Sequence, residues 1–326
     1  MKCWQVSEYG EPNEVLKQAD KEPPTPGSGE LLLEVNVAAF GLPDVLMCRN
    51  SYLFSPELPF TPGQEVVGKV LAAGEHCQTA VGSRVMAVTA FYNGHGGLAE
   101  KAIVLDASAF AVPDGMSDAE AAGFTIPFHT AFVGLVTRAK LEPGETVLVH
   151  GAAGGSGIAA VQLAHALGAT VIACASSEEK LQLCEQSGAD ILINHRELNV
   201  RDAVMEATGG AGVNIVYDPV GGDTFTDSLH YMANEGRVLA IGLASGDWGQ
   251  ASTGLAVIKN CSVMGVYVGA YGQDHMSAAH DELTTLYAEG KITPAVDECI
   301  AFADIAIGLQ RLADRKVRGK LVAKIS

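Results

Sequence analysis

The sequence predicts an α/β protein that combines a doubly wound parallel sheet of six strands with a mostly β domain. Two textures along the chain lead to this prediction. The first 120 residues are rich in proline and glycine and hold short β-like runs, whereas strand-then-helix units begin at about residue 125. A glycine-rich turn at 151–157 joins the first of these later strands to its helix.

The β-like runs of the first part are 31–37, 66–74, 84–88 and 98–104. Turn clusters such as "PPTPGSGE" separate them. Short apolar runs between turn clusters are typical of an all-β domain.

The later part repeats a strand, a helix and a glycine. The predicted strands are 146–150, 170–175, 191–193, 213–217, 237–241 and 262–268, and the predicted helices are 158–167, 178–187, 200–208 and 223–233. The early strands are apolar on both faces, as a sheet with helices on each side requires. Glycines follow most of the helices, where a left-handed C-cap residue is favoured.

The closing segment, 302–326, reads as a helix and a final strand. Because the six-strand sheet is already complete, we expect this segment to return to the first domain. The predicted division is 124–268 for the doubly wound, dinucleotide-binding domain and 1–123 with 269–326 for the mostly β substrate domain.

Composition narrows the class of function. The net charge is −17 and no Lys/Arg-rich run occurs, which argues against binding to nucleic acid or to an anionic membrane. We also expect no signal peptide, since the N-terminus lacks an apolar core. No membrane span is expected, because the longest uncharged stretch, 121–137, contains Pro127, His129 and glycines. Seven scattered cysteines without a C-x-x-C pair indicate reduced thiols and a cytoplasmic protein.

The turn "HGAAGGSG" is the strongest chemical signal. It follows a strand and opens a helix, the context in which unpaired N–H groups and the helix dipole bind a pyrophosphate. A strict G-x-G-x-x-G would need glycine where Ala152 stands. The alternative is a loop that needs only flexibility, but the context favours a dinucleotide site formed by Gly154, Gly155, Ser156 and Gly157.

The end of the second predicted strand, 170–175, indicates which dinucleotide the site binds. Sites for NAD usually place Asp or Glu there, whereas this strand ends in Ala175, Ser176 and Ser177. NADPH is therefore expected, with a 2′-phosphate site formed by Ser176, Ser177, Lys180, His195 and Arg196. The alternative makes Ser177 a helix N-cap and Lys180 part of a solvated face, and Glu178 argues against NADPH.

Motifs along nearly the whole chain allow a family comparison. "PFTPGQEVVGKV", "GGLAEKAIV", "LEPGETVLVHGAAGGSG", "YDPVGGDTF" and "RGKLV" resemble the zinc-free quinone oxidoreductase branch of the medium-chain dehydrogenase/reductase superfamily. The resemblance implies a GroES-like first domain and a Rossmann second domain. It also implies a homodimer that pairs through the edge strand near 261–269, whose apolar edge needs a partner.

Metal chemistry is not expected. Zinc-dependent members of the superfamily carry a G-H-E ligand motif, and Gly63-Gln64-Glu65 stand at that place. No set of three or four ligands at zinc-like spacing replaces it. A quinone or an enone makes a lesser demand than an alcohol, since its reduction leaves a phenolate-like or enolate oxygen, with a pKa near 10 for a phenol.

The resemblance also suggests residues near the reacting groups. Tyr52 falls on a family position for a donor or substrate contact, with a purely packing role as the alternative. Gly41 stands where many members have Asn, and Asp44 is expected to organise a turn or cap a helix. Thr130 matches a family position beside the nicotinamide, with a buried helix hydroxyl as the alternative. Gly242 and Ser245 follow the fifth strand, where a doubly wound sheet places its ligand crevice, and they are expected to line the cofactor, with a tight turn as the alternative.

These features predict an NADPH-dependent, zinc-independent reductase that transfers hydride to a small-molecule quinone or α,β-unsaturated carbonyl. A 2-enoyl-thioester (enoyl-CoA) reductase and an NADPH-binding protein with little turnover remain as alternatives.

Overall fold

The strand–helix alternation of the middle of the chain produces a parallel sheet of six strands. The computed structural model describes residues 1–326, which form two units: 1–126 with 294–326, and 127–293. In the second unit the strand order is β12-β11-β10-β7-β8-β9, and every pairing is parallel. The strands are β7 (Thr146–Val149), β8 (Thr170–Ala175), β9 (Ile191–Asn194), β10 (Val213–Asp218), β11 (Met232–Ala240) and β12 (Ser262–Gly265). The predicted doubly wound sheet is confirmed.

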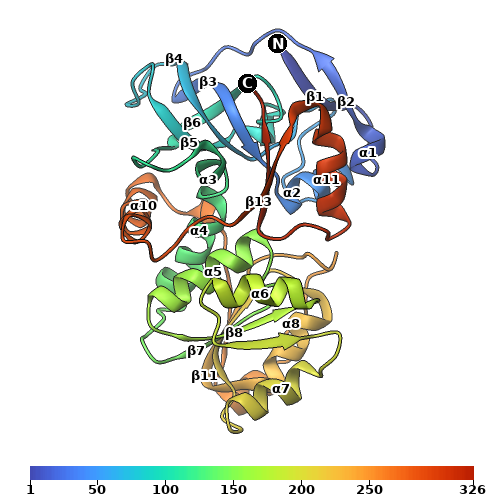
Figure 1. Ribbon diagram of the computed structural model, residues 1–326, viewed down its shortest axis with the longest axis vertical. Coiled ribbons are helices and arrows are strands. Elements are labelled where there is room, and N and C mark those ends of the chain that lie inside the picture. The colour runs from blue at the N-terminus through green and yellow to red at the C-terminus, as the bar shows by residue number, and fades with distance from the viewer. The chain divides into compact units, whose positions relative to one another are not determined.

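Helices cover both faces of this sheet, with α5 and α6 on one face and α7 and α8 on the other (Figure 1). Their bounds are α5 (Gly155–Ala166), α6 (Glu178–Gln186), α7 (Val200–Ala207), α8 (Gly222–Ser228), α9 (Thr253–Lys259) and α10 (Gln273–Ala288). Before them, α4 (Thr125–Phe132) continues into a π-helical segment, Val133–Arg138. The helix predicted at 223–233 is shorter, because a 3₁₀ turn follows α8 and Met232 already pairs with β10.

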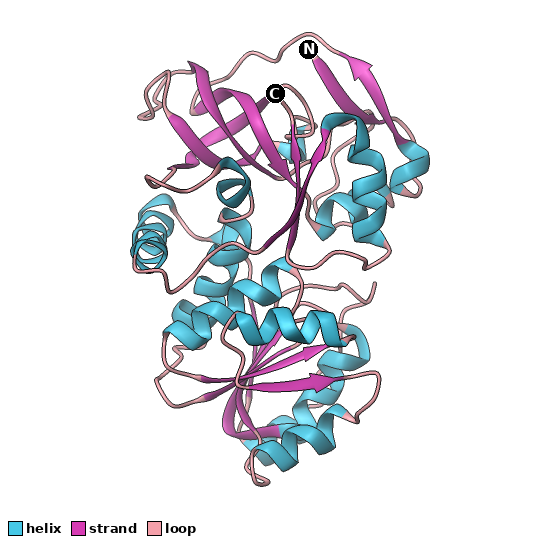
Figure 2. Cartoon of the chain, viewed as in Figure 1, coloured by secondary structure: helices cyan, strands magenta, loops and turns pink.

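The first unit is mostly β, as predicted (Figure 2). Its six-stranded sheet has the order β13-β14-β3-β4-β5-β6, and β3 also pairs with β6, so these strands close on themselves. The strands are β3 (Glu30–Ala39), β4 (Glu65–Ala73), β5 (Arg84–Thr89), β6 (Lys101–Ala111), β13 (Val296–Ala301) and β14 (Lys320–Lys324), beside a hairpin of β1 (Lys2–Val6) and β2 (Leu16–Asp20). The helices are α1 (Pro12–Val15), α2 (Leu42–Cys48), α3 (Asp118–Ala122) and α11 (Ile305–Ala313).

The closing helix and strand join the first unit, because β14 pairs antiparallel with β3 through Val322 and Ala39. The segment 269–293 lies in the second unit, whereas the sequence-based division placed it in the first. Hydrogen bonds fasten it there. His280 of α10 contacts His129 of α4 at 3.1 Å, and Thr293 exchanges two hydrogen bonds with the Gln162 amide on α5.

Each unit has its own apolar core. In the second unit the core lies between the sheet and helices α7 and α8, with Leu148, Val216 and Phe225 among its members. In the first unit it fills the closed sheet, where Leu33 and Val66 are buried. No helix combines the length and apolar character that crossing a bilayer requires.

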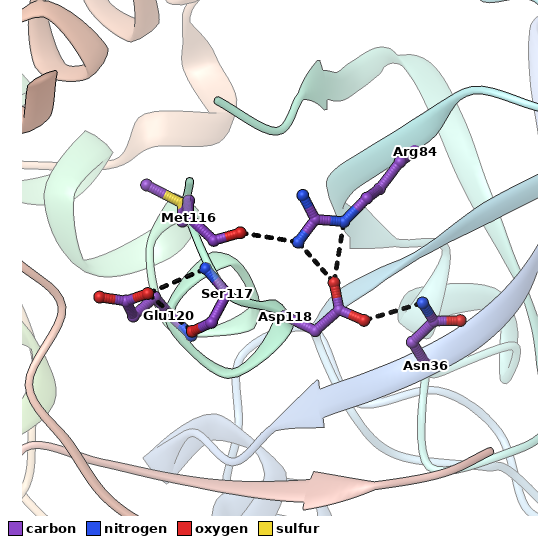
Figure 3. Close-up of polar contacts among 6 residues, drawn as sticks. All are labelled: Asn36, Arg84, Met116, Ser117, Asp118 and Glu120. Carbon is purple, nitrogen blue, oxygen red and sulfur yellow. Dashed lines mark hydrogen bonds and ion pairs between the residues drawn. The ribbon is translucent and has the colours of Figure 1, made fainter. Parts of the chain in front are cut away.

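A polar cluster holds α3 on the sheet of the first unit (Figure 3). Arg84 of β5 donates to Asp118 Oδ1 at 2.6 and 2.9 Å, and Asn36 of β3 donates to Asp118 Oδ2 at 2.8 Å. Ser117 and Glu120 form a capping box at the start of the helix. These contacts fix α3 on the sheet of the first unit.

Candidate functional site

The glycine-rich turn connects the end of β7 to the start of α5. Gly151 carries the left-handed backbone, with φ of 54°, whereas Ala152 does not lie in the left-handed region. The Ala152 amide donates to the Cys174 carbonyl of β8, and its side chain is fully buried. Alanine therefore fits at the place of the first motif glycine, because its neighbour makes the turn.

Two glycines of the turn have different roles. A Cβ on Gly157 would collide with Gly151 O and Ala152, so this glycine permits the close approach of helix and strand. A Cβ on Gly154 would meet only Gly151 O, at 3.4 Å. The protein's own packing thus does not require glycine at position 154. Because Gly154 has no side chain, its exposed backbone is accessible to a ligand.

The N-terminus of α5 has open amides. Its first internal bond runs from Ile158 N to Gly154 O, and no side chain caps the helix. The N–H groups of Gly155, Ser156 and Gly157 therefore lack partners within the helix. Such groups, with the helix dipole, form a binding site for an anion such as a pyrophosphate.

Ser156, in the first turn of α5, has a side-chain contact with the sheet. Ser156 Oγ lies 2.7 Å from the hydroxyl of Tyr217, a fully buried residue of β10. Sequence reasoning gave Tyr217 no functional role. Its place in "VYDPVGG", near the end of a sheet strand, was the available signal.

The ends of β8 and β9 meet at one corner of the sheet. Ala175 pairs with Asn194, and His195 N donates to Ala175 O. Ser176 and Ser177 directly follow β8, and His195 and Arg196 directly follow β9, at neighbouring strand ends. Lys180 is the third residue of α6, the helix that follows β8. At this corner the start of α6 has no side-chain cap, and the basic residues are Lys180, His195 and Arg196. Both features favour the binding of an anion.

Details of the corner support the expectation of an anion site there. Ser177 occupies the N-cap position of α6, as the alternative interpretation expects. Its side chain, however, makes no capping hydrogen bond to the helix. Arg196 is exposed and its guanidinium forms no ion pair. Glu178, the first residue of α6, is exposed.

The loop after β11 packs on the loop after β10. Gly242 N and Ser245 N donate to Asp218 O and Val220 O, and a Cβ on Gly242 would lie 3.0 Å from Pro219 O. Ser245 is exposed, and its hydroxyl donates to Asp247 O in a local turn. In this structure Ser245 therefore forms part of a tight turn, as the alternative interpretation expects.

Asp218 organises this pair of loops. Its buried carboxylate accepts hydrogen bonds from the amides of Val220 and Gly221. Burial raises its pKa to about 6, against the lowering effect of those hydrogen bonds. Sequence reasoning did not single out this residue.

A second buried polar network lies at the end of β7. His150 Nε2 is 3.0 Å from the Tyr231 hydroxyl and 3.2 Å from Ser228 Oγ. Burial, and secondly the charge of His195, lower the pKa of His150 to about 3, so the imidazole is neutral. Thr130, the remaining candidate of this unit, is half-buried on α4.

In the first unit, Asp44 is the third residue of α2. Its carboxylate accepts from Gly41 N and from Gly63 N, both at 2.8 Å, and burial raises its pKa to about 6. The expected turn-organising role is confirmed, and Gly41 is the helix N-cap. Tyr52 is half-buried, with its ring 6.3 Å from that of Phe91.

The residues at the G-H-E position form no cluster of metal ligands. Glu65 accepts from Lys320 Nζ at 2.6 Å and from Ile126 N at 2.7 Å. The Gln64 amide nitrogen is buried without a hydrogen-bond partner. No group of three or more His, Cys, Asp or Glu side chains is arranged to hold a metal ion.

Comparisons with known proteins place this arrangement in a class. Residues 27–114 match the alcohol dehydrogenase GroES-like domain, and residues 155–285 match the domain described as zinc-binding dehydrogenase. Fold and sequence thus define a medium-chain dehydrogenase/reductase.

The relatives define the branch. The chain is 34% identical to quinone oxidoreductase-like protein 2 of Bos taurus over 95% of this chain and 89% of that protein. A mycobacterial structure complexed with NADPH is 31% identical, with 99% of both chains covered and a TM-score of 0.91. Escherichia coli quinone oxidoreductase, complexed with NADPH, is 27% identical, with 99% of this chain and 100% of that chain covered and a TM-score of 0.90. The chain belongs to the quinone oxidoreductase family of oxidoreductases.

Proposed function

We propose that this chain is an NADPH-dependent reductase that transfers hydride to a quinone or an α,β-unsaturated carbonyl without a metal ion. The observation that carries the proposal is the uncapped start of α5, together with an adjacent strand tip that has two serines and no acidic residue. The NADPH complexes of two structural neighbours support it.

The residues present fit such a cofactor. In the proposal the amides of Gly155, Ser156 and Gly157 bind the pyrophosphate, beside the open backbone of Gly154. The 2′-phosphate is bound by side chains of the β8–β9 corner: Ser176, Ser177, Lys180, His195 and Arg196. Thr130, Gly242 and Ser245 line the rest of the cofactor. Bound NADPH supplies the hydride.

Quinones and enones suit a site without a Lewis acid. The oxygen formed on a quinone is phenolate-like, with an acid pKa near 10, so binding and orientation supply much of the catalysis. Gln64, a side chain that ligates zinc poorly, stands where the zinc members have histidine. We propose Tyr52 as the substrate contact or proton donor, because it is half-buried beside other aromatic rings.

We also propose a homodimer through the outer edge of β12. This strand ends the parallel sheet, and its outer edge pairs with no other strand of the chain. Apolar side chains on and near it are exposed: Val257 by 76%, Ile258 by 74%, Val263 by 45% and Tyr267 by 55%. A second copy would cover both the open edge and these side chains.

The test is a steady-state assay of NADPH oxidation with three acceptors: 1,4-benzoquinone, 9,10-phenanthrenequinone and crotonyl-CoA. Turnover with a quinone supports the proposal. Turnover confined to crotonyl-CoA would make the protein an enoyl-thioester reductase. Tight NADPH binding without turnover of any acceptor would make it a binding protein.

A further inference from the structure

The Ser156–Tyr217 pair has a feature that the cofactor proposal does not use. Tyr217 is fully buried and its hydroxyl contacts one partner, Ser156 Oγ at 2.7 Å. Burial raises the pKa of the phenol, so it stays protonated. The other buried tyrosine of this unit, Tyr231, has two partners, His150 and Ser228, and neither belongs to the glycine-rich turn.

The ring of Tyr217 is held firmly. Its strand lies in the middle of the sheet, with Val149 and Leu239 as its neighbours on β7 and β11. Gly134 packs against the ring, since a Cβ there would lie 3.3 Å from Cε2. The hydroxyl is therefore presented from the centre of the sheet to the first turn of α5.

The direction of the hydrogen bond follows from counting donors. A buried phenol O–H must donate, and Ser156 Oγ is its one acceptor. Because Ser156 accepts this bond, its own proton is left to donate elsewhere. No protein acceptor takes that proton, and Ser156 is half-buried between Gly155 and Gly157, whose amides donate to no protein acceptor.

We propose that Tyr217 is a positioning residue, which fixes Ser156 so that the serine hydroxyl donates to a pyrophosphate oxygen of the cofactor. This inference rests on the proposed NADPH site. Hydrogen bonds to charged oxygens are stronger than neutral ones, so the loss of this donor should weaken binding measurably.

The experiment compares dissociation constants of two ligands, NADPH and adenosine 2′-monophosphate, which has the 2′-phosphate but no pyrophosphate. Ser156→Ala is expected to raise the Kd of NADPH about tenfold, and Tyr217→Phe about fivefold. The double variant should bind like Ser156→Ala, because the tyrosine acts through the serine. The Kd of adenosine 2′-monophosphate should stay unchanged in all three variants.

Tyr231→Phe is the matched control, since it removes a buried phenol hydroxyl from the same unit without touching Ser156. It should leave both dissociation constants unchanged. If Tyr217→Phe does not fold, Gly134→Ala displaces the ring instead and should weaken NADPH binding alone.

The inference is overturned if Tyr217→Phe binds NADPH as the unchanged protein does, if the two single effects add, or if both ligands weaken equally. A failure of the proposed function is distinct, since the unchanged protein would then not bind NADPH at all, and that result overturns both.

Discussion

Lys320 Nζ lies 2.6 Å from Glu65 Oε2, and both side chains are almost fully buried. The lysine, on the last strand of the chain, also donates to Phe40 O, and the carboxylate also accepts from Ile126 N. One ion pair thus joins the segment "RGKLV" to the segment "GQE". The Glu65 side chain is committed to this structural contact.

Removing one partner of the Lys320–Glu65 ion pair should destabilise the folded protein. Lys320→Met leaves a buried carboxylate without its cation, and we expect it to lower the free energy of unfolding by about 3–5 kcal/mol. Urea denaturation measures this effect. Lys316→Met is the control, since it breaks the exposed pair with Asp314 and should change stability by less than about 1 kcal/mol. Equal small effects of both variants would show that the buried pair contributes little.

His150 should make stability depend on pH. Burial lowers its pKa to about 3, whereas an unfolded histidine titrates near 6.5. Between these values the unfolded chain binds a proton that the folded protein does not, so stability falls as the pH decreases from about 6.5 towards 3. The slope for one group is about 1.4 kcal/mol per pH unit.

His150→Gln removes this contribution. Between pH 6.5 and 4.5 the unchanged protein should lose roughly 2–3 kcal/mol more than the variant. The comparison must be between variants, because Asp44 and Asp218, with pKa values raised to about 6, add stability as the pH falls below 6. His230→Gln, at an exposed histidine, is the control. Parallel curves for His150→Gln and the unchanged protein would refute the assignment.

Cofactor preference should depend on the β8–β9 corner. NADPH is expected to bind at least tenfold more tightly than NADH, and Arg196→Ala or Lys180→Ala should reduce that ratio several-fold by weakening NADPH binding. Fluorescence titration with both cofactors measures it. Arg201→Ala, at an exposed arginine on α7, should leave the ratio unchanged. Equal affinities for the two cofactors in the unchanged protein would contradict the NADPH assignment.

Assembly should depend on the β12 edge. Light scattering is expected to give the mass of a dimer, and Val263→Lys or Ile258→Glu should give a monomer, because each places a charge among exposed apolar side chains. Leu198→Glu, at an exposed leucine before α7, is the control and should remain dimeric. A monomeric mass for the unchanged protein would rule out the proposed dimer.

The fold could be predicted because its signals are local. Strand-then-helix repeats and the glycine-rich turn identify the parallel sheet, and the ends of β8 and β9 meet because parallel strands end at one edge. The place of 269–293 could not be predicted, since it depends on side-chain contacts such as that of His280 with His129.

The Ser156–Tyr217 and Glu65–Lys320 contacts could not be predicted from the sequence for the same reason. Tyr217 and Ser156 are 61 residues apart, and Lys320 and Glu65 are 255 apart. No periodicity relates such positions, and only the packed structure brings them together. Ala152 shows the reverse case, since a missing motif glycine is harmless when Gly151 makes the turn.

The most direct test of metal-independent quinone reduction is the rate of NADPH oxidation with 9,10-phenanthrenequinone after exhaustive dialysis against a chelator. We predict the same turnover before and after dialysis, and no increase when zinc is added. Activity that disappears on dialysis and returns with zinc, or the absence of turnover despite tight NADPH binding, would contradict the proposed function.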